Sequence, residues 1–164
     1  ATMALAAMTA PDGRGRRHRI SMPNGDFDLI DDSYNASPVS MRAAFKVLAG
    51  ATVLQGGRRI AVLGEMKELG PASGDMHSAL AADIEAAGID LVITSGALMA
   101  GLSEALPGIM RVAQCENSDE AADKAVDVIR PGDVILVKGS LASGMARVVE
   151  GLMALEATPR VVNG

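Results

Sequence analysis

Apolar positions along the chain follow two spacings in turn, which predicts strands alternating with helices. Short continuous apolar runs, typical of buried strands, occur at 59–63, 90–94, 109–113 and 134–137. Helical spacing of apolar residues covers 38–50, 71–88, 98–106, 118–129 and 145–153. Ser37 suits an N-cap and Pro38 a first helical residue, and Ser118 is expected to cap the helix that follows it.

Two short strands and a tight turn precede this alternation. The turn is Pro23-Asn24-Gly25-Asp26, in which Asn-Gly favours the positive φ angles of a hairpin. Strands joined through helices are expected to run parallel, with right-handed crossovers and helices on both faces of the sheet. The predicted fold class is therefore α/β. It is a Rossmann-like three-layer domain whose mostly parallel sheet has about six strands and begins with an N-terminal β-hairpin.

The first residues stand apart from this pattern. The stretch up to Ala10 has the character of a short helix with little to pack against, and Pro11-Asp12-Gly13 ends it. We expect residues 1–12 to be the trailing helix of a preceding domain and residues 13–164 to form a domain of their own. The chain also lacks an initiator Met, which predicts that it was processed or cut from a longer protein.

The composition of the chain argues against several classes of function. A single cysteine, Cys115, excludes an internal disulfide and a cysteine-only zinc site, and two histidines argue against a histidine-based metal site. The net charge of −5 argues against a nucleic-acid binder. No apolar run is long enough to span a membrane, and the apolar start lacks the positive residues of a signal peptide. We expect a cytoplasmic monomer that binds neither nucleic acid nor membrane.

The common phosphate-binding loops are absent from the sequence. The glycine spacing of Gly139 and Gly144 is followed by Met145 and Ala146, not by the lysine and hydroxyl of a G-x-x-x-x-G-K-[ST] loop. No G-x-G-x-x-G follows a strand either. In parallel sheets, ligands bind beyond the carboxyl ends of the strands. The predicted ends carry polar residues at 31–35, 64–66, 94–96 and 138–140.

The densest of these clusters is Asp31-Asp32-Ser33-Tyr34-Asn35. Its carboxylates can accept ribose hydroxyls or hold a cation, its Tyr ring can stack on a base or sugar, and its Asn can pair with a base edge. The alternative is a helix-entry turn, because Asp, Ser and Asn all favour caps. The residue types leave both interpretations open.

Other polar residues also have a functional and a structural interpretation. Lys138 suits an anionic ligand or is an exposed loop lysine, and Glu65 is a ligand or a solvated carboxylate. The basic run at 14–19 can clamp phosphate or form a solvated edge; alternate strand residues point to opposite faces, so at most two of its side chains converge. His77 is expected to be a satisfied packing residue, and Cys115 to be inert.

Four stretches resemble signatures of the MurF-type Mur ligases, in the family's order. Residues 30–41, IDDSYNASPVSM, are similar to DDSYNANPxSM, with Ser37 in place of the second Asn. Residues 61–70, AVLGEMKELG, are similar to GDMxELG, with Glu65 in place of Asp, and His77 follows where the family often has histidine. LVKGS at 136–140 and the Gly-Arg segment at 13–19 complete a resemblance that covers about residues 10–155.

The resemblance implies the last of three domains, a Rossmann-like domain that closes over the site, with the P-loop in the central domain. Residues 1–12 would be the final helix of that central ATPase domain. The implied activity is ATP- and Mg²⁺-dependent ligation of D-alanyl-D-alanine (D-Ala-D-Ala) to UDP-N-acetylmuramoyl-tripeptide, in bacterial peptidoglycan precursor synthesis. The P-loop and metal ligands are expected in the missing domains. This chain alone is therefore expected to be inactive, with no catalytic or metal-binding residue of its own.

The resemblance also implies nucleotide contacts. Asp32, Tyr34 and Asn35 would hold the ribose and base side of ATP. An arginine of the Gly-Arg segment would reach the phosphates. Arg14 fits the motif and Arg17 fits the spacing to Asp32, so both remain candidates.

Contacts to the second substrate are implied on the other strand ends. Lys138 and Ser140, with Glu65, would face the incoming dipeptide or the acyl-phosphate intermediate. The implied mechanism activates the tripeptide carboxylate as an acyl phosphate, which the dipeptide amine then attacks. Domain closure would bring this domain's lysine and arginine to the transferred phosphate and exclude water.

Two other classes share some of these features. A phosphoacceptor receiver domain also has a βα repeat, paired acidic residues after its first strand and a lysine after its last, as Asp31-Asp32 and Lys138 would provide. It needs an Asp at the end of a middle strand, where Gly64-Glu65 stands here, and the leading hairpin does not fit it. A stand-alone nucleotide-binding module is the remaining hypothesis.

Overall fold

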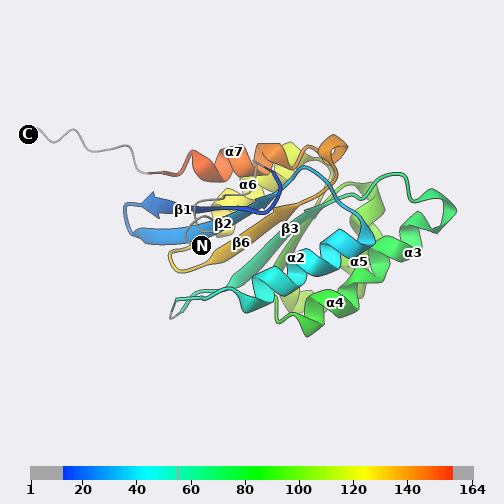
Figure 1. Cartoon of the computed structure of the whole chain (residues 1–164), viewed down its shortest axis with the longest axis horizontal. Helices are drawn as coiled ribbons and strands as arrows, with labels where there is room; N and C mark the ends of the chain where they lie inside the picture. The colour runs from blue at the N-terminus through cyan, green and yellow to red at the C-terminus, as the bar shows by residue number, and fades with distance from the viewer. Residues whose placement is uncertain (1–12, 55, 157–164) are drawn as a thin grey trace, which may run out of the picture.

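The computed structural model describes residues 13–54 and 56–156, and the helix expected within residues 1–12 lies outside the described residues. Strands and helices alternate in chain order (Figure 1). The strands are β1 Arg16–Met22, β2 Gly25–Asp32, β3 Arg59–Gly64, β4 Leu91–Ser95, β5 Arg111–Cys115 and β6 Val134–Lys138. The α-helices are α2 Pro38–Gly50, α3 Ser73–Ser78, α4 Leu80–Ala86, α5 Ala100–Ala105, α6 Ser118–Val128 and α7 Ala146–Met153. Short 3₁₀ turns cover Gly70–Ala72, Ala97–Met99, Gly108–Met110 and Leu141–Ser143.

The strands form one sheet in the order β1-β2-β6-β3-β4-β5. Among the strands of the described residues, only the β1–β2 hairpin is antiparallel, and all other pairs are parallel. The predicted α/β class, with a mostly parallel sheet and a leading hairpin, is confirmed. The strand β6 comes last in the chain but lies between β2 and β3. Neighbouring strands therefore continue into different parts of the chain at their carboxyl ends, and such a switch point in strand order is where open α/β sheets form a binding crevice.

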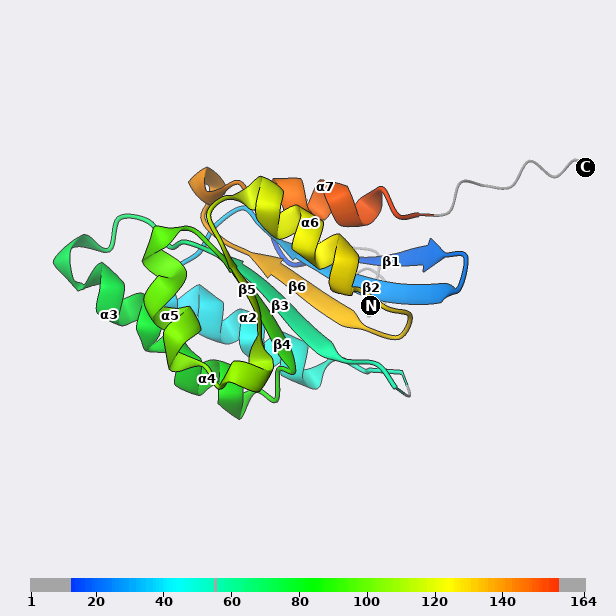
Figure 2. The same cartoon turned by 180° about the vertical axis from the view of Figure 1, so that it is seen from behind.

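Helices cover both faces of the sheet, as the two opposite views show (Figures 1 and 2). The helices α2 to α5 lie on one face, and their apolar residues form a core with Ile30, Leu63 and Leu136. The helices α6 and α7 lie on the other face, over a second core that includes Phe27 and Ile135. Adjacent residues of one strand, such as Ile135 and Leu136, thus pack into the two cores on opposite faces of the sheet. This explains why the central strands are continuously apolar rather than alternating.

Most predicted apolar stripes are buried where expected. The stripe on α2 consists of Met41, Ala44, Phe45 and Leu48, all buried, and Ser37 caps the helix with a hydroxyl that accepts from the Ser40 amide at 3.1 Å. A fully buried aliphatic or aromatic side chain of this kind contributes about 1.5–3 kcal/mol. The predicted helix start and its buried face are both confirmed.

Three boundaries differ from the sequence-based expectation. The helix expected over 71–88 is divided into a 3₁₀ turn, α3 and α4. The strand expected at 109–113 begins later, at Arg111, because the Met110 amide donates to the Pro107 carbonyl at 2.9 Å and closes a 3₁₀ turn first. The N-cap of α6 is Asn117 rather than Ser118, since the Asn117 Oδ1 accepts from the Glu120 amide at 2.9 Å.

Candidate functional site

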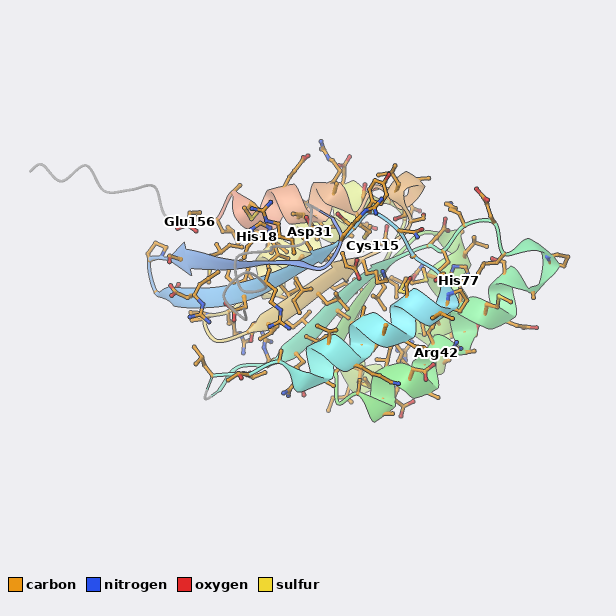
Figure 3. All side chains as sticks on the ribbon, viewed as in Figure 1. His18, Asp31, Arg42, His77, Cys115 and Glu156 are labelled. Atoms are coloured by element: carbon orange, nitrogen blue, oxygen red, sulfur yellow. The ribbon has the colours of Figure 1, made fainter. Side chains whose placement is uncertain are left out.

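The loop after β2 is tied to the start of β1 by one buried carboxylate. Asp31 Oδ2 accepts from the Gly13 amide at 3.0 Å, and its Oδ1 accepts from the Ser33 hydroxyl at 2.6 Å. The Gly15 amide donates to the Asp31 carbonyl at 2.7 Å. Asp31, labelled in Figure 3, lies on β2 and is 5% exposed. These bonds occupy Asp31 with its own chain, so this residue of the pair shapes the loop and Asp32 is the one directed to the site.

Arg14 and Tyr34 meet across this tie. The Tyr34 amide donates to the Gly13 carbonyl at 2.8 Å, which brings the two segments together. Gly13 has a φ of +80°, a conformation that glycine adopts without strain. The Arg14 guanidinium carbon lies 4.0 Å from the centroid of the Tyr34 ring, in cation–π contact. Tyr34 nevertheless keeps 42% of its surface exposed, so an aromatic ring and a cation stand together at the surface.

Lys138, at the end of β6, is almost completely buried, with 2% of its surface exposed. Its ammonium donates to Asp32 Oδ2 and to the Asn35 carbonyl, both at 2.9 Å. Strand pairing places Asp32 directly opposite Lys138. The structure therefore excludes the exposed loop lysine considered from the sequence, and it links the ends of β2 and β6 through one ion pair.

A first cleft of about 370 Å³ opens beside this pair. It brings together five of the predicted site residues, namely Arg14, Asp32, Tyr34, Asn35 and Lys138. Its other wall is the face of α2 that carries Ser40, Ala43, Ala44 and Val47. Sequence reasoning did not include this wall, although its spacing of three and four residues next to the buried stripe was visible.

A second cleft, of about 720 Å³, shares Tyr34 and Asn35 with the first. Its remaining lining residues are Ala36, Ser37, Lys67, Glu68, Leu69, Ser140, Leu141 and Ala142. Ser140 is 6% exposed, and its hydroxyl is the one buried side-chain polar atom without a hydrogen-bond partner among the residues that the structure describes. An unpaired buried hydroxyl carries an energetic cost. The Ser140 Oγ is itself shielded from the cleft, so a ligand there would relieve this cost only if the side chain turned towards it.

Glu65 belongs to neither cleft's lining. Its carboxylate accepts from the Lys67 ammonium at 2.6 Å and from the Leu98 amide at 2.8 Å. Gly96 lies against it with a φ of +103°, and a Cβ at Gly96 would approach the carboxylate to 2.5 Å. Burial opposes ionisation of Glu65, but the hydrogen bonds from Lys67 and Leu98 outweigh it and lower the pKa of the carboxyl group. Lys67, which the sequence analysis did not single out, lines the second cleft in its place.

The remaining basic residues of the hairpin do not gather at the clefts. Arg17 is exposed on β1, opposite Ile30 in the pairing, and neither cleft lining includes it. Arg19 forms an ion pair with Asp28 at 2.8 Å, with 64% of its side chain exposed. Of the two arginines left open by the sequence, Arg14 therefore lines one of these two clefts and Arg17 lines neither.

His77 and Cys115 are buried and engaged in structure. His77 Nε2 accepts from the Met66 amide at 3.0 Å, and its Nδ1 lies 2.6 Å from the Ser73 carbonyl oxygen, so Nδ1 carries the proton. His77 on α3 thus orients the loop that follows β3 (Figure 3). Burial, with a smaller effect of the Glu120 charge, raises the pKa of the Cys115 thiol to about 11. The thiol is protonated near neutral pH and therefore a poor nucleophile.

The two clefts can hold different chemistry. The first offers a ring face, a carboxylate and a guanidinium, which suit the base, ribose and phosphates of a nucleotide. The second offers a buried hydroxyl with the charged Lys67 and Glu68 on its lining, which suit a small zwitterion. Within residues 13–54 and 56–156, no group of three or more His, Cys, Asp or Glu side chains is arranged to hold a metal ion. No helix in the same ranges is long and apolar enough to cross a membrane.

Comparison with known proteins identifies one family. The family model described as "Mur ligase, glutamate ligase domain" matches residues 15–141. The UDP-N-acetylmuramoyl-tripeptide--D-alanyl-D-alanine ligase of Mycobacterium tuberculosis is 34% identical to the chain, over 93% of the chain and 34% of the relative. The ligase of the same name from Escherichia coli is 36% identical, over 76% of the chain and 26% of the relative. The chain thus spans about a third or less of the length of these curated relatives.

Solved structures share the fold. A structure of MurF from Acinetobacter baumannii superposes with a TM-score of 0.78 and 27% identity, over 93% of this chain and 33% of that one. MurF ligase from Thermotoga maritima, solved in complex with ADP, superposes with a TM-score of 0.75 and 24% identity, over 94% of this chain and 34% of that one.

Proposed function

The chain belongs to the Mur ligase family, and from this premise we propose that it is the C-terminal domain of an ATP-dependent ligase that joins D-Ala-D-Ala to UDP-N-acetylmuramoyl-tripeptide. The relatives that support this proposal carry the name of that activity, and each is about three times as long as the chain or longer. The proposed setting is peptidoglycan precursor synthesis in a bacterial cytoplasm. The receiver-domain alternative is not favoured, because the family match covers most of the chain.

The observation that carries the proposal is the wall that the two clefts share at Tyr34 and Asn35. A ligase must hold the nucleotide that activates one substrate next to the amine of the other. Two clefts that adjoin at one loop suit that task, because their occupants would lie side by side in fixed orientation. A domain that bound one nucleotide alone would need only the first cleft.

In the first cleft, we assign ATP to the residues that the resemblance named. In this assignment the Tyr34 ring stacks on the base or sugar and the Asp32 carboxylate accepts ribose hydroxyls, which is supported by their shared cleft. The Asn35 side chain lines the same wall. We assign the phosphates to Arg14, since it lies on the cleft with Tyr34, whereas Arg17 lies on β1 outside both linings.

In the second cleft, we assign the dipeptide. D-Ala-D-Ala carries an ammonium and a carboxylate group, and the lining includes the Ser140 hydroxyl together with Lys67 and Glu68. The unpartnered Ser140 hydroxyl could donate to the dipeptide carboxylate. Glu65 would act through Lys67, which it holds by an ion pair, rather than by touching the substrate.

The phosphoryl-transfer machinery itself is not found in these residues. The sequence has no P-loop lysine, and the described residues offer no cluster suited to Mg²⁺. We therefore expect this chain by itself to show no ATP-dependent ligation and only weak nucleotide affinity. A ligation assay on the chain alone, followed by mass spectrometry of the product, tests this. Formation of the D-Ala-D-Ala adduct by the chain alone would contradict it.

A pair of variants in the full-length protein tests the assignment of the clefts. Asn35 lines both clefts, but we assign its side chain to the nucleotide. Asn35→Ala keeps the backbone carbonyl that binds Lys138, so we expect the KM for ATP to rise more than the KM for the dipeptide. Ser140→Ala should raise the KM for the dipeptide more than that for ATP. Ser103→Ala is the matched control, because Ser103 is buried to a similar extent on α5, outside both linings. The reverse pattern of KM changes would overturn the assignment.

A further inference from the structure

Lys138 poses a problem that the proposed function does not solve. By resemblance it was expected to face the dipeptide, yet it lines the first cleft and not the second. Its ammonium is buried and spends two of its three donors on its own chain, at 2.9 Å from Asp32 Oδ2 and 2.9 Å from the Asn35 carbonyl. A charge buried in this way is tolerated only when it is paired and hydrogen-bonded.

The two partners of Lys138 are the last residue of β2, Asp32, and Asn35 in the loop that follows, and this loop has a second attachment. On the far side, Asp31 binds the Ser33 hydroxyl, and the Tyr34 amide binds the Gly13 carbonyl. Lys138 therefore supplies the inner attachment and Asp31 the outer one. Held between them, the loop presents the Tyr34 ring and the Asn35 side chain to the cleft in one conformation.

The ion pair also sets the charge of the first cleft. Asp32 lies opposite Lys138 in the sheet and shares that cleft with it. An unpaired carboxylate there would repel the phosphates of a nucleotide, whereas a carboxylate paired with an ammonium presents little net charge. The bond to Lys138 uses Oδ2, so Oδ1 can still accept a hydroxyl.

From these contacts we infer that Lys138 is a positioning residue for the nucleotide cleft and does not contact the dipeptide or the transferred phosphate. It acts through Asp32 and through the backbone of Asn35. This inference rests on the proposed function for its kinetic test only. The attachment of the loop to Lys138 is a property of the described contacts, and it can be measured without any substrate.

The kinetic test is a double-mutant cycle in the full-length protein. Lys138→Met keeps the length of the side chain and removes its charge and donors. We expect it to raise the KM for ATP about tenfold or more while the KM for D-Ala-D-Ala changes less than about twofold. Because Lys138 acts through Asp32, Lys138→Met should add little to an Asp32→Asn background, where the charged pair is already lost. Lys124→Met, an exposed lysine of α6, is the control and should leave all constants unchanged.

A variant that partly restores ATP affinity distinguishes a positioning role of Lys138 from a direct role of its charge. Lys138→Gln retains an N–H₂ donor for the Asp32 carboxylate without the charge, so it should recover part of the ATP affinity that Lys138→Met loses. This variant also keeps the test valid if Lys138→Met fails to fold. A fall in kcat with an unchanged KM for ATP, a larger rise in the dipeptide KM, or independent effects in the cycle would each overturn the inference.

Hydrogen exchange provides the readout that does not depend on ligation. In Lys138→Met the amides of Ser33 and Tyr34 should exchange faster, since their loop has lost its inner attachment, and in Lys124→Met they should not. Unchanged exchange in Lys138→Met would refute the positioning role. If the wild-type protein does not ligate D-Ala-D-Ala but this exchange pattern holds, the proposed function fails and the role of Lys138 stands.

Discussion

Buried polar side chains lie at both ends of the parallel sheet, and their hydrogen bonds are completed differently. At the amino end, the Asp133 carboxylate accepts from the backbone amides of Arg58 and Arg130, each at 2.9 Å, and from the Arg58 guanidinium at 2.7 Å. The neighbouring Arg59 guanidinium donates to two carbonyls at the end of α2. All of these partners come from the chain itself, so this end of the sheet is complete as a structure.

At the carboxyl end, the polar groups beside the clefts are not all hydrogen-bonded to other described residues. Lys138 has its partners in the chain, but the Ser140 hydroxyl has none among the described residues, and Tyr34 remains exposed under Arg14. The residue types at the two ends are alike. What differs is that, at the carboxyl end, β2 and β6 lead to α2 and α7 on opposite faces of the sheet, so their loops diverge and leave space. The binding end is therefore distinguished by polar groups that have no partner among the described residues, and not by the presence of charge.

The largest expected effect on the free energy of unfolding comes from replacing Asp133 at the amino end of the sheet. Asp133→Ala removes the acceptor of two backbone amides, and it leaves the partly buried Arg58 guanidinium without the carboxylate. Asp133 itself is 1% exposed. We expect a loss of about 3–5 kcal/mol in the free energy of unfolding, measured by urea denaturation. If the variant folds, the KM for ATP of the full-length protein should not change, because the clefts lie at the other end of the sheet.

The exposed Arg19–Asp28 pair provides the control for this prediction. Asp28→Ala breaks an ion pair whose arginine is 64% exposed, so its effect on stability should be several-fold smaller than that of Asp133→Ala. Equal effects of the two substitutions would mean that the closed network around Asp133 is not what stabilises the amino end.

His77 is the exception that sharpens the comparison, since it is a fully satisfied polar group at the carboxyl end. His77→Phe would leave the buried Met66 amide without its acceptor, which should cost about 1–3 kcal/mol in the free energy of unfolding. It should also disorder the loop that carries Lys67. His18→Gln, on the half-buried hairpin strand, is the matched control and should have a much smaller effect in the same urea titration. Similar losses in both variants would contradict the role given to His77.

Ser140→Ala should have an effect on stability of the opposite sign. Removing a buried hydroxyl that has no partner relieves a desolvation cost, so the free energy of unfolding should stay constant or rise by up to about 1 kcal/mol. Ser103→Ala is the control, because it shows how removing a buried serine hydroxyl elsewhere changes the free energy of unfolding. A destabilised Ser140→Ala protein would show that the hydroxyl is already satisfied in solution, and the comparison between the two ends would lose its main support.

Much of the fold could be predicted from apolar spacing because the spacing follows directly from the two-sided sheet. The stripe at Met41, Ala44, Phe45 and Leu48 is buried in the core, as a 3.6-residue period requires. The errors fall where short-range hydrogen bonds decide. Pro107 accepts from the Met110 amide and delays β5, and Asn117 takes the cap that Ser118 was expected to form.

The candidate site was predictable to the level of the strand ends and no further. The parallel sheet explains why Asp32 and Lys138, far apart in the sequence, meet at one edge. Which ligand each side chain faces depends on contacts with distant loops. Glu65 is turned towards Leu98 by a loop that follows another strand, and Lys138 is taken up by Asp32 and Asn35. Motif spacing contains no information on such contacts. In our proposals the dipeptide role expected for Glu65 therefore became an indirect one, and Lys138 moved to the nucleotide cleft.

The smallest effect concerns Glu65, whose ion pair with Lys67 borders the second cleft. Its lowered pKa means that the ionised carboxylate stabilises the fold above the usual carboxyl pKa of about 4.3, and that this contribution is lost as the pH falls through the lower folded value. Glu65→Gln keeps an acceptor for the Leu98 amide and loses the charge. It should therefore be less stable than the wild type at pH 7, by less than about 1 kcal/mol, because Lys67 is partly exposed. Urea titrations should show the difference shrinking at pH 3. A constant difference across this range, or a dipeptide KM that rises in Glu65→Gln but not in Lys67→Met, would place Glu65 on the substrate instead.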